Sequence, residues 1–182
     1  MNLRGLVALT LAAFVAHAAE PEFDLKAALP ALLRILPYDV NFDARGSGPF
    51  VVLVVSAHGA SPGLAREIKD VTVPDIKKRA VRFVTIDFST EAALQAAIDA
   101  HRASALLVVP GIVADTLHSV WDVAQDNQLY ALALDAATVE ACIPIGVTMD
   151  GGKPRILIHE KSSRAVGARF ETVVLKLARV IQ

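Results

Sequence analysis

The sequence predicts one α/β domain with a mostly parallel sheet and flanking helices, either Rossmann-like or similar to one lobe of a periplasmic binding protein. Two observations support this class. Apolar runs rich in Val, Leu and Ile alternate with segments of helical spacing, which is typical of parallel βαβ units. The alternation stops near the end of the chain, where two apolar runs flank residues 150–153 (Asp-Gly-Gly-Lys), a pattern that favours an antiparallel hairpin. We expect this hairpin and a C-terminal helix to close the sheet.

The elements can be assigned in chain order. A helix is expected over residues 24–36, and Pro30 either kinks it or stands at its first position. Residues 50–55 form an apolar run without polar alternation, which predicts a strand buried on both faces, and we place this strand at the centre of the sheet. The other expected elements are a helix that Ser61 caps and Pro62 begins, strands at 81–87, 105–109, 130–134, 143–149 and 154–159, and helices at 90–101, 113–124 and 170–181.

The predicted C-terminal helix has an apolar stripe and is expected to dock on the sheet. Leu175 and Val180 lie off this stripe, so they would leave apolar surface for a partner or for a neighbouring helix. The stripe consists of Phe170, Val173, Val174, Leu177 and Ile181.

The composition predicts a core of small aliphatic side chains and excludes some partners. Of the 182 residues, 54% are hydrophobic but only 5% are aromatic. The formal net charge is −1, and a nucleic-acid partner would require a basic face, so we expect no nucleic acid. Cys142 is the only cysteine, which excludes a disulfide within the chain. We expect it to be a small buried hydrophobe rather than a reactive thiol.

The first residues have the features of a cleavable signal peptide. Arg4 precedes an uncharged apolar run over residues 5–15, and Ala16-His17-Ala18 places small residues where signal peptidase reads them. The run is shorter than the roughly 20 residues of a membrane-spanning helix. We therefore predict that residues 1–18 are removed and that residues 19–182 form a single periplasmic domain. An uncleaved N-terminal anchor is the alternative.

Motifs for catalysis, metals and cofactors are missing from the sequence. Residues 46–48 (Gly-Ser-Gly) precede the first strand, where they cannot serve a dinucleotide. Residues 58–63 follow that strand but lack the Lys of a P-loop, so they form either an ordinary turn or an anion contact. The histidines show no metal-ligand spacing, and Ser56 has no glycine elbow. We expect no catalytic residue, no metal and no cofactor, and a protein that is not an enzyme.

Candidate contact residues gather at the ends of the predicted strands, because open α/β sheets bind ligands outside the carboxyl ends of their strands. Asp87 and Asp135 end strands there, although such carboxylates often only cap the next helix. His101 is expected to be a packed histidine rather than a ligand. The candidates at the strand ends are Ser56, His58, Asp87, Pro110 and Gly111.

A second candidate group follows the first helix. Tyr38, Asp39 and Asn41 form either a turn that fixes the helix on the sheet or a contact site for a ligand or partner. The sequence leaves these two interpretations open.

Two stretches resemble a known family. Residues 145–158 contain the Asp-Gly turn, and residues 174–180 (Val-Leu-Lys-Leu-Ala-Arg-Val) follow them. Residues 36–42 (Leu-Pro-Tyr-Asp-Val-Asn-Phe) are similar to a motif Tyr-Asp-x-Asn that closes the first helix. Together these segments resemble the YfiR-like family of exported bacterial regulatory proteins, in its branch with the Tyr-Asp-x-Asn motif.

The resemblance implies a periplasmic repressor in cyclic-di-GMP signalling. Such a repressor holds an inner-membrane diguanylate cyclase inactive until an outer-membrane lipoprotein sequesters it. The single Cys142 departs from the family's type member, which relies on paired cysteines, so redox control of that kind is not expected.

Two functions from different classes follow. The first is a non-enzymatic regulator that acts by protein contact, and the alternative is a periplasmic small-ligand-binding protein with a crevice at the strand ends. A pocket lined by Ser56, His58, Asp87 and Pro110 would favour the ligand-binding protein, whereas a broad apolar surface would favour the regulator. A homodimer is left open.

Overall fold

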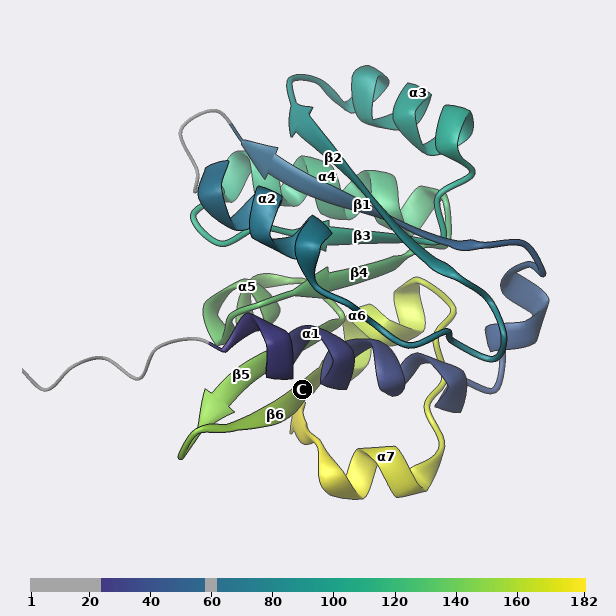
Figure 1. Cartoon of the computed structure of the whole chain (residues 1–182), viewed down its shortest axis with the longest axis vertical. Coiled ribbons are helices and arrows are strands. Elements are labelled where there is room, and N and C mark those ends of the chain that lie inside the picture. The colour runs from purple at the N-terminus through teal and green to yellow at the C-terminus, as the bar shows by residue number, and fades with distance from the viewer. Residues whose placement is uncertain (1–23, 58–61) are drawn as a thin grey trace, which may run out of the picture.

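Seven strands form one mixed sheet in the residues that the computed structural model describes, 24–57 and 62–182 (Figure 1). Their order is β2-β1-β3-β4-β5-β6-β7, and the first five pair in parallel. β5 and β6 are antiparallel, and β7 pairs in parallel with β6. The strands are β1 (Phe50–Ala57), β2 (Val81–Phe88), β3 (Ala105–Val108), β4 (Tyr130–Ala133), β5 (Ile145–Asp150), β6 (Lys153–His159) and β7 (Arg179–Ile181). The predicted mostly parallel α/β fold with one antiparallel hairpin is confirmed.

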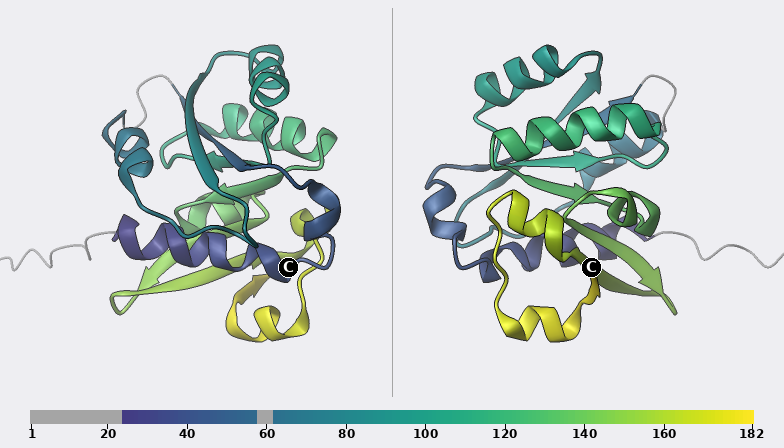
Figure 2. Two further views of the ribbon diagram at one scale, coloured as in Figure 1. Left: turned by 45° about the vertical axis from the view of Figure 1, so that its right-hand side comes forward. Right: turned by 180° about the vertical axis from the view of Figure 1, so that it is seen from behind.

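Helices cover both faces of this sheet (Figure 2). α1 and α2 lie on one face, while α3 and α4 pack on the other, as the two apolar cores show. Short 3₁₀ turns at Leu36–Tyr38 and Phe42–Arg45 connect α1 to β1. The helices are α1 (Leu25–Arg34), α2 (Pro62–Asp70), α3 (Glu91–His101), α4 (Ala114–Asp126), α5 (Ala136–Ala141), α6 (Glu160–Ala165) and α7 (Thr172–Leu177).

β1 is buried on both faces, as predicted, because successive side chains alternate between the two cores. Val52 and Val54 pack with α1 and α2, whereas Leu53 and Val55 pack with α3 and α4. The central position predicted for this strand is wrong. β1 stands beside the edge strand β2, because the chain adds β3, β4 and β5 on one side only.

α1 runs continuously through Pro30, so the interpretation in which the helix begins at Pro30 is wrong. The helix begins earlier because Asp24 caps it, and its carboxylate accepts a hydrogen bond of 3.1 Å from the backbone N–H of Ala27. α1 packs on β5 and β6. The predicted cap of α2 at Ser61 lies outside the described residues.

The turn between β5 and β6 is a two-residue hairpin at Gly151 and Gly152, with φ values of +56° and +77°. Both residues adopt the left-handed conformation that a type I′ turn requires and that glycine accepts at low cost. The hairpin is confirmed at the predicted place.

The predicted helix over residues 170–181 is wrong in length. α7 ends at Leu177, and the chain then extends into β7, which pairs with β6 from Leu157↔Arg179 to His159↔Ile181. The open edge of β6 offers backbone hydrogen bonds to Val180 and Ile181, both β-branched residues that suit a strand. Of the predicted stripe only Val174 is buried, while Val173 and Leu177 are exposed.

Candidate functional site

Ser56 and Asp87 lie side by side at the carboxyl ends of β1 and β2. The Ser56 hydroxyl is 2.5 Å from a carboxylate oxygen of Asp87 and 3.2 Å from the carbonyl oxygen of Ile86. It has one proton and can donate to one of them at a time. Ser56 is buried and Asp87 is exposed. A hydrogen bond from the Ser56 hydroxyl would therefore hold the Asp87 carboxylate in place at the solvent-exposed end of the sheet. Among the described residues, no histidine hydrogen-bonds to Ser56.

Pro110 and Gly111 lie at the same end of the sheet, beyond β3. Val109 still donates a backbone hydrogen bond of 3.0 Å to Val55, after which Gly111, with φ +94°, turns the chain toward α4. The sheet order places the chain's change of direction between β1 and β3, which is where open α/β sheets bind ligands. The structure therefore brings four of the predicted residues to one end of the sheet, and His58 lies outside the described residues.

The other aspartate predicted at a strand end has a structural role. Asp135 caps α5, because its carboxylate accepts hydrogen bonds of 2.7 Å from both the backbone N–H and the hydroxyl of Thr138.

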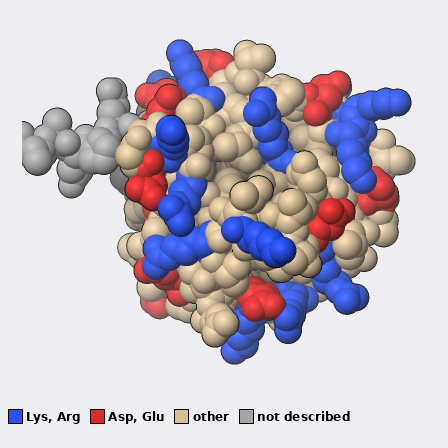
Figure 3. All heavy atoms as spheres, turned by 90° about the horizontal axis from the view of Figure 1, so that it is seen from below, with Lys and Arg blue, Asp and Glu red and all other residues tan. Residues whose placement is uncertain are grey.

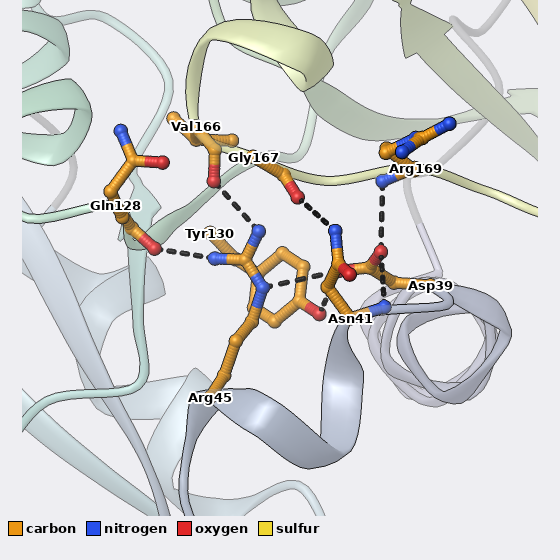
Figure 4. Close-up of polar contacts among 8 residues, drawn as sticks. All are labelled: Asp39, Asn41, Arg45, Gln128, Tyr130, Val166, Gly167 and Arg169. Carbon is orange, nitrogen blue, oxygen red and sulfur yellow. Dashed lines mark hydrogen bonds and ion pairs between the residues drawn. The ribbon is translucent and has the colours of Figure 1, made fainter.

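Asp39 lies at the opposite end of the sheet, where its buried carboxylate accepts four hydrogen bonds (Figure 4). One oxygen accepts from the backbone N–H of Asn41 at 3.1 Å and of Arg169 at 2.8 Å. The other accepts from the hydroxyl of Tyr130 at 2.6 Å and from Nε of Arg45 at 3.1 Å. These donors match the acceptor capacity of an ionised carboxylate.

Arg45 extends this network to two further segments. Its remaining N–H groups donate to the carbonyl oxygens of Gln128 and, at 2.7 Å, of Val166. Its guanidinium carbon lies 4.3 Å above the ring centroid of Tyr130, a cation–π contact. Burial first, and then the hydrogen bond to Asp39, raise the pKa of the Tyr130 hydroxyl far above its usual value, so this hydroxyl stays a donor. We call Asp39, Asn41, Arg45 and Tyr130 the Asp39 clasp.

The residues of the Tyr-Asp-x-Asn motif differ in burial, since Asp39 is buried and Tyr38 is exposed. The side-chain amide of Asn41 donates to the carbonyl oxygen of Gly167 at 2.9 Å, and Asp39 is saturated by protein donors. This geometry favours the interpretation of these two residues as a turn that fixes the first helix. Tyr38 differs, because 45% of it is exposed. The distant clasp members Arg45 and Tyr130 had no signal in the sequence that would link them to the motif.

An apolar groove of about 340 Å³ lies next to Tyr38, between α1, β6 and α7. Two of its residues are large and strongly exposed, since Val173 is 51% and Leu177 is 79% accessible. Figure 3 views the molecule from this side and shows a hollowed area of uncharged residues with Lys and Arg as well as Asp and Glu side chains around it. The groove, which we call the α7 groove, is lined by Arg34, Ile35, Tyr38, Ile156, Val173, Val174, Leu177 and Ala178.

Cys142 is buried, as predicted. Burial, and to a lesser degree Asp122, raise the pKa of its thiol to about 11. The thiol is therefore protonated at neutral pH and is a poor nucleophile.

Within residues 24–57 and 62–182, no three His, Cys, Asp or Glu side chains come together in a way that could hold a metal ion. None of the helices in these residues has the length and hydropathy needed to cross a membrane.

Comparison with known proteins shows the fold. No family model matches the chain. No curated protein matches it either. Among solved structures it is similar to the ABC domain in complex with L-Trp from Streptococcus pneumoniae, with a TM-score of 0.60, 13% identity and coverage of 84% of this chain and 60% of that chain.

Two further structures give the same result. A conserved domain protein from Vibrio cholerae has a TM-score of 0.57 and 14% identity, with 85% of this chain and 58% of that chain covered. The ligand-free, open form of a substrate-binding protein with adhesive properties from Clostridium difficile has a TM-score of 0.53 and 13% identity, with 73% and 54% covered. The chain thus spans 54% to 60% of the length of these solved chains. It shares its fold with the matched part of each of these three chains.

Proposed function

We propose that this protein is an exported, non-enzymatic regulator that binds a partner protein through the α7 groove. The observation that carries the proposal is the groove itself, a hollow bordered by the exposed side chains of Tyr38, Val173 and Leu177. Grouped exposed apolar side chains with a polar surround are typical of protein-interaction sites. In keeping with the resemblance to the YfiR-like family, the proposed partners are an inner-membrane diguanylate cyclase and an outer-membrane lipoprotein.

The charges around the groove define the partner's chemistry. Arg34 lines the groove, and Lys176 stands exposed on α7. Arg179, the first residue of β7, is also exposed and forms a 3.0 Å ion pair with Glu140. A segment with apolar side chains at its centre and carboxylates at its rim would complement this surface.

β7 adds a second means of contact. It is the last strand in the sheet order, so within the described chain its outer edge has no neighbouring strand. An open edge can accept an extended partner segment by backbone hydrogen bonding. The partner segment is therefore proposed to bind beside α7 and along β7.

The regulatory proposal is tested by placing a charge in the groove. In a strain that lacks the gene, cellular cyclic-di-GMP should change, and the wild-type gene should restore it. The Val173→Asp/Leu177→Asp variant should fail to restore it, because each carboxylate would enter an apolar contact. Val113→Asp is the matched control, since Val113 is 66% exposed but stands at the start of α4. Full restoration by the double variant, or no change on deletion, would overturn the proposal.

A second candidate function is small-ligand binding at the carboxyl ends of β1, β2 and β3. It is favoured by the gathering of Ser56, Asp87 and Gly111 at the point where the strand order changes direction. The fold shared with substrate-binding proteins supports it as well. Amino acids are a suitable first probe set, and Asp87→Asn should weaken binding if the exposed carboxylate contacts an ammonium group. If calorimetry shows no binding of any amino acid, amino-acid binding at this site is excluded.

A further inference from the structure

A basic cavity lies at the amino ends of β1, β2 and β3, on the side of the sheet away from Ser56 and Asp87. Its volume is about 460 Å³. Four arginines and a histidine line it, and no carboxylate does. The lining residues are Arg45, Gly46, Gly48, Pro49, Val51, Arg79, Arg82, His101, Arg102, Ala103 and Ser104. A cavity with this lining attracts anions in a chain whose formal net charge is −1.

Arg79 at the base of this cavity is a buried cation, with only 9% of its surface exposed. Its Nε donates to the carbonyl oxygen of Gly48 at 2.6 Å, and Nη2 lies 3.2 Å from the hydroxyl oxygen of Ser104. Its Nη1 is buried and has no hydrogen-bond partner among the described residues. The guanidinium therefore has neutral partners and one unused donor group.

The guanidinium of Arg79 has no carboxylate partner within the described chain. Asp43 acts on it only at a distance, and Lys77 pairs with that carboxylate at 2.8 Å. Burial lowers the pKa of Arg79, the direction expected for a positive charge whose compensation is incomplete. Buried charges in proteins are ordinarily paired.

Arg45 shows what full compensation looks like in the same region. Its guanidinium forms an ion pair with Asp39, and each of its nitrogens has an acceptor. Arg79 also has aromatic contacts, since the ring centroids of Phe42 and Phe50 lie 5.5 and 5.1 Å from its guanidinium carbon. Within the described residues, Arg79 differs from Arg45 in having no carboxylate partner.

We propose that this basic cavity binds a small oxyanion that carries at least two negative charges, of the phosphate type. Arg79 and the hydroxyl of Ser104 form its base, while the exposed Arg82 and Arg102 form its rim. His101 belongs to the same lining, which corrects its prediction as a packed histidine. It is exposed because α3 buries Leu94 and Ile98 and ends with His101.

The cavity has room for more than inorganic phosphate. A second hollow shares Arg45, Gly46, Ala103 and Ser104 with it, and no carboxylate lines that hollow either. A phosphate group in the basic cavity could therefore carry an organic part that extends toward Asn127 and Gln128. This site is at the opposite end of the sheet from the strand-end candidates, so it does not depend on the proposed regulatory function.

The test measures binding of inorganic phosphate and of pyrophosphate by calorimetry and by thermal melting, with sodium chloride at equal ionic strength as the reference. Both anions should raise the melting temperature of the wild-type protein more than chloride does. The Arg82→Gln/Arg102→Gln variant should bind pyrophosphate at least about tenfold more weakly, because two charge-assisted hydrogen bonds are lost. Lys153→Gln/Lys161→Gln, with the same change in net charge at exposed positions elsewhere, should bind like the wild type.

Variants at the base of the cavity test whether anions bind at this site or respond only to the overall charge of the protein. Ser104→Ala keeps every charge and should still weaken binding, because one hydrogen-bond partner of the anion is removed. Arg79→Met should abolish the response to phosphate, if the variant folds. Stabilisation no greater than that by chloride would overturn the proposal. Equal binding by the rim variant and the lysine variant would overturn it as well, since it would show an unspecific ionic effect.

Discussion

The Asp39 clasp and the α7 groove are neighbours in the chain but opposite in character. In the clasp, a buried carboxylate has every acceptor position occupied by protein donors, so it offers no group to a ligand. In the groove, Leu177 and Val173 are 79% and 51% exposed. Tyr38 and Asp39 are adjacent in the sequence, yet Tyr38 lines the α7 groove and Asp39 accepts the hydrogen bonds of the Asp39 clasp. Sequence neighbours in one motif can therefore serve stability and partner contact separately.

The largest expected effect is that of Asp39→Ala. The substitution leaves the partly buried guanidinium of Arg45 without its ion-pair partner and removes an acceptor from the Tyr130 hydroxyl. Breaking this pair, in which only Asp39 is fully buried, should cost about 3 kcal/mol of unfolding free energy, the lower end of the range for fully buried pairs. Urea denaturation measures this cost.

Asp43→Ala is the control for that change. Asp43 pairs with Lys77 at 2.8 Å, but both side chains are exposed, so the loss should be below about 1 kcal/mol. Equal destabilisation by the two substitutions would contradict the central role of the Asp39 clasp.

Tyr130→Phe should have an intermediate effect. It keeps the ring that stacks with Phe42 and lies under Arg45, and it removes only the hydroxyl that donates to Asp39 at 2.6 Å. Loss of a hydrogen bond to a charged group should cost about 1.5 to 3 kcal/mol. Tyr38→Phe, at the exposed tyrosine, should leave the urea midpoint unchanged. A midpoint that moves as far for Tyr38→Phe would show that the hydroxyl of Tyr130 is not what matters.

The reactivity of Cys142 tests burial in a third part of the molecule. Burial raises the pKa of its thiol to about 11 in the folded state. The protonated thiol therefore contributes fully to the unfolding free energy at pH values below the thiol pKa of the unfolded chain. This contribution is lost as the pH rises through the thiol pKa of the folded state. At pH 8 iodoacetamide should therefore modify the folded protein slowly and the urea-unfolded protein quickly, as mass spectrometry can follow. Equal rates at pH 8 would show that Cys142 is accessible in the folded chain.

Most of the fold could be predicted from short stretches of sequence, because most helices, strands and turns are specified by residues within them. The run at 50–55 and the Gly151-Gly152 turn each specify an element within a few residues. The C-terminal strand β7 could not be found in this way, because its partner β6 lies more than twenty residues earlier and supplies the hydrogen bonds that end α7.

The candidate sites were also predictable only where neighbouring sequence or the regular geometry of the sheet brings their residues together. Ser56 and Asp87 were predictable because the ends of parallel strands meet at one edge of a sheet. The Asp39 clasp joins residues as far apart as Asp39 and Arg169, which are separated by 130 positions, and no local pattern links them. The lack of a carboxylate partner for Arg79 within the described residues could not be predicted either, since a sequence does not show which carboxylates reach a given arginine.

The smallest effect on stability is expected for Leu177→Asp, a substitution in the α7 groove. Leu177 is 79% exposed at the last position of α7, so the folded state loses almost no apolar burial when it is replaced. Substitutions at such surface positions change the unfolding free energy by about 0.5 kcal/mol or less. The urea midpoint should therefore stay at the wild-type value, in contrast to Asp39→Ala. If α7 instead melts and the midpoint falls as far as it does for Asp39→Ala, then Leu177 supports the fold, and the groove cannot be assigned to a partner.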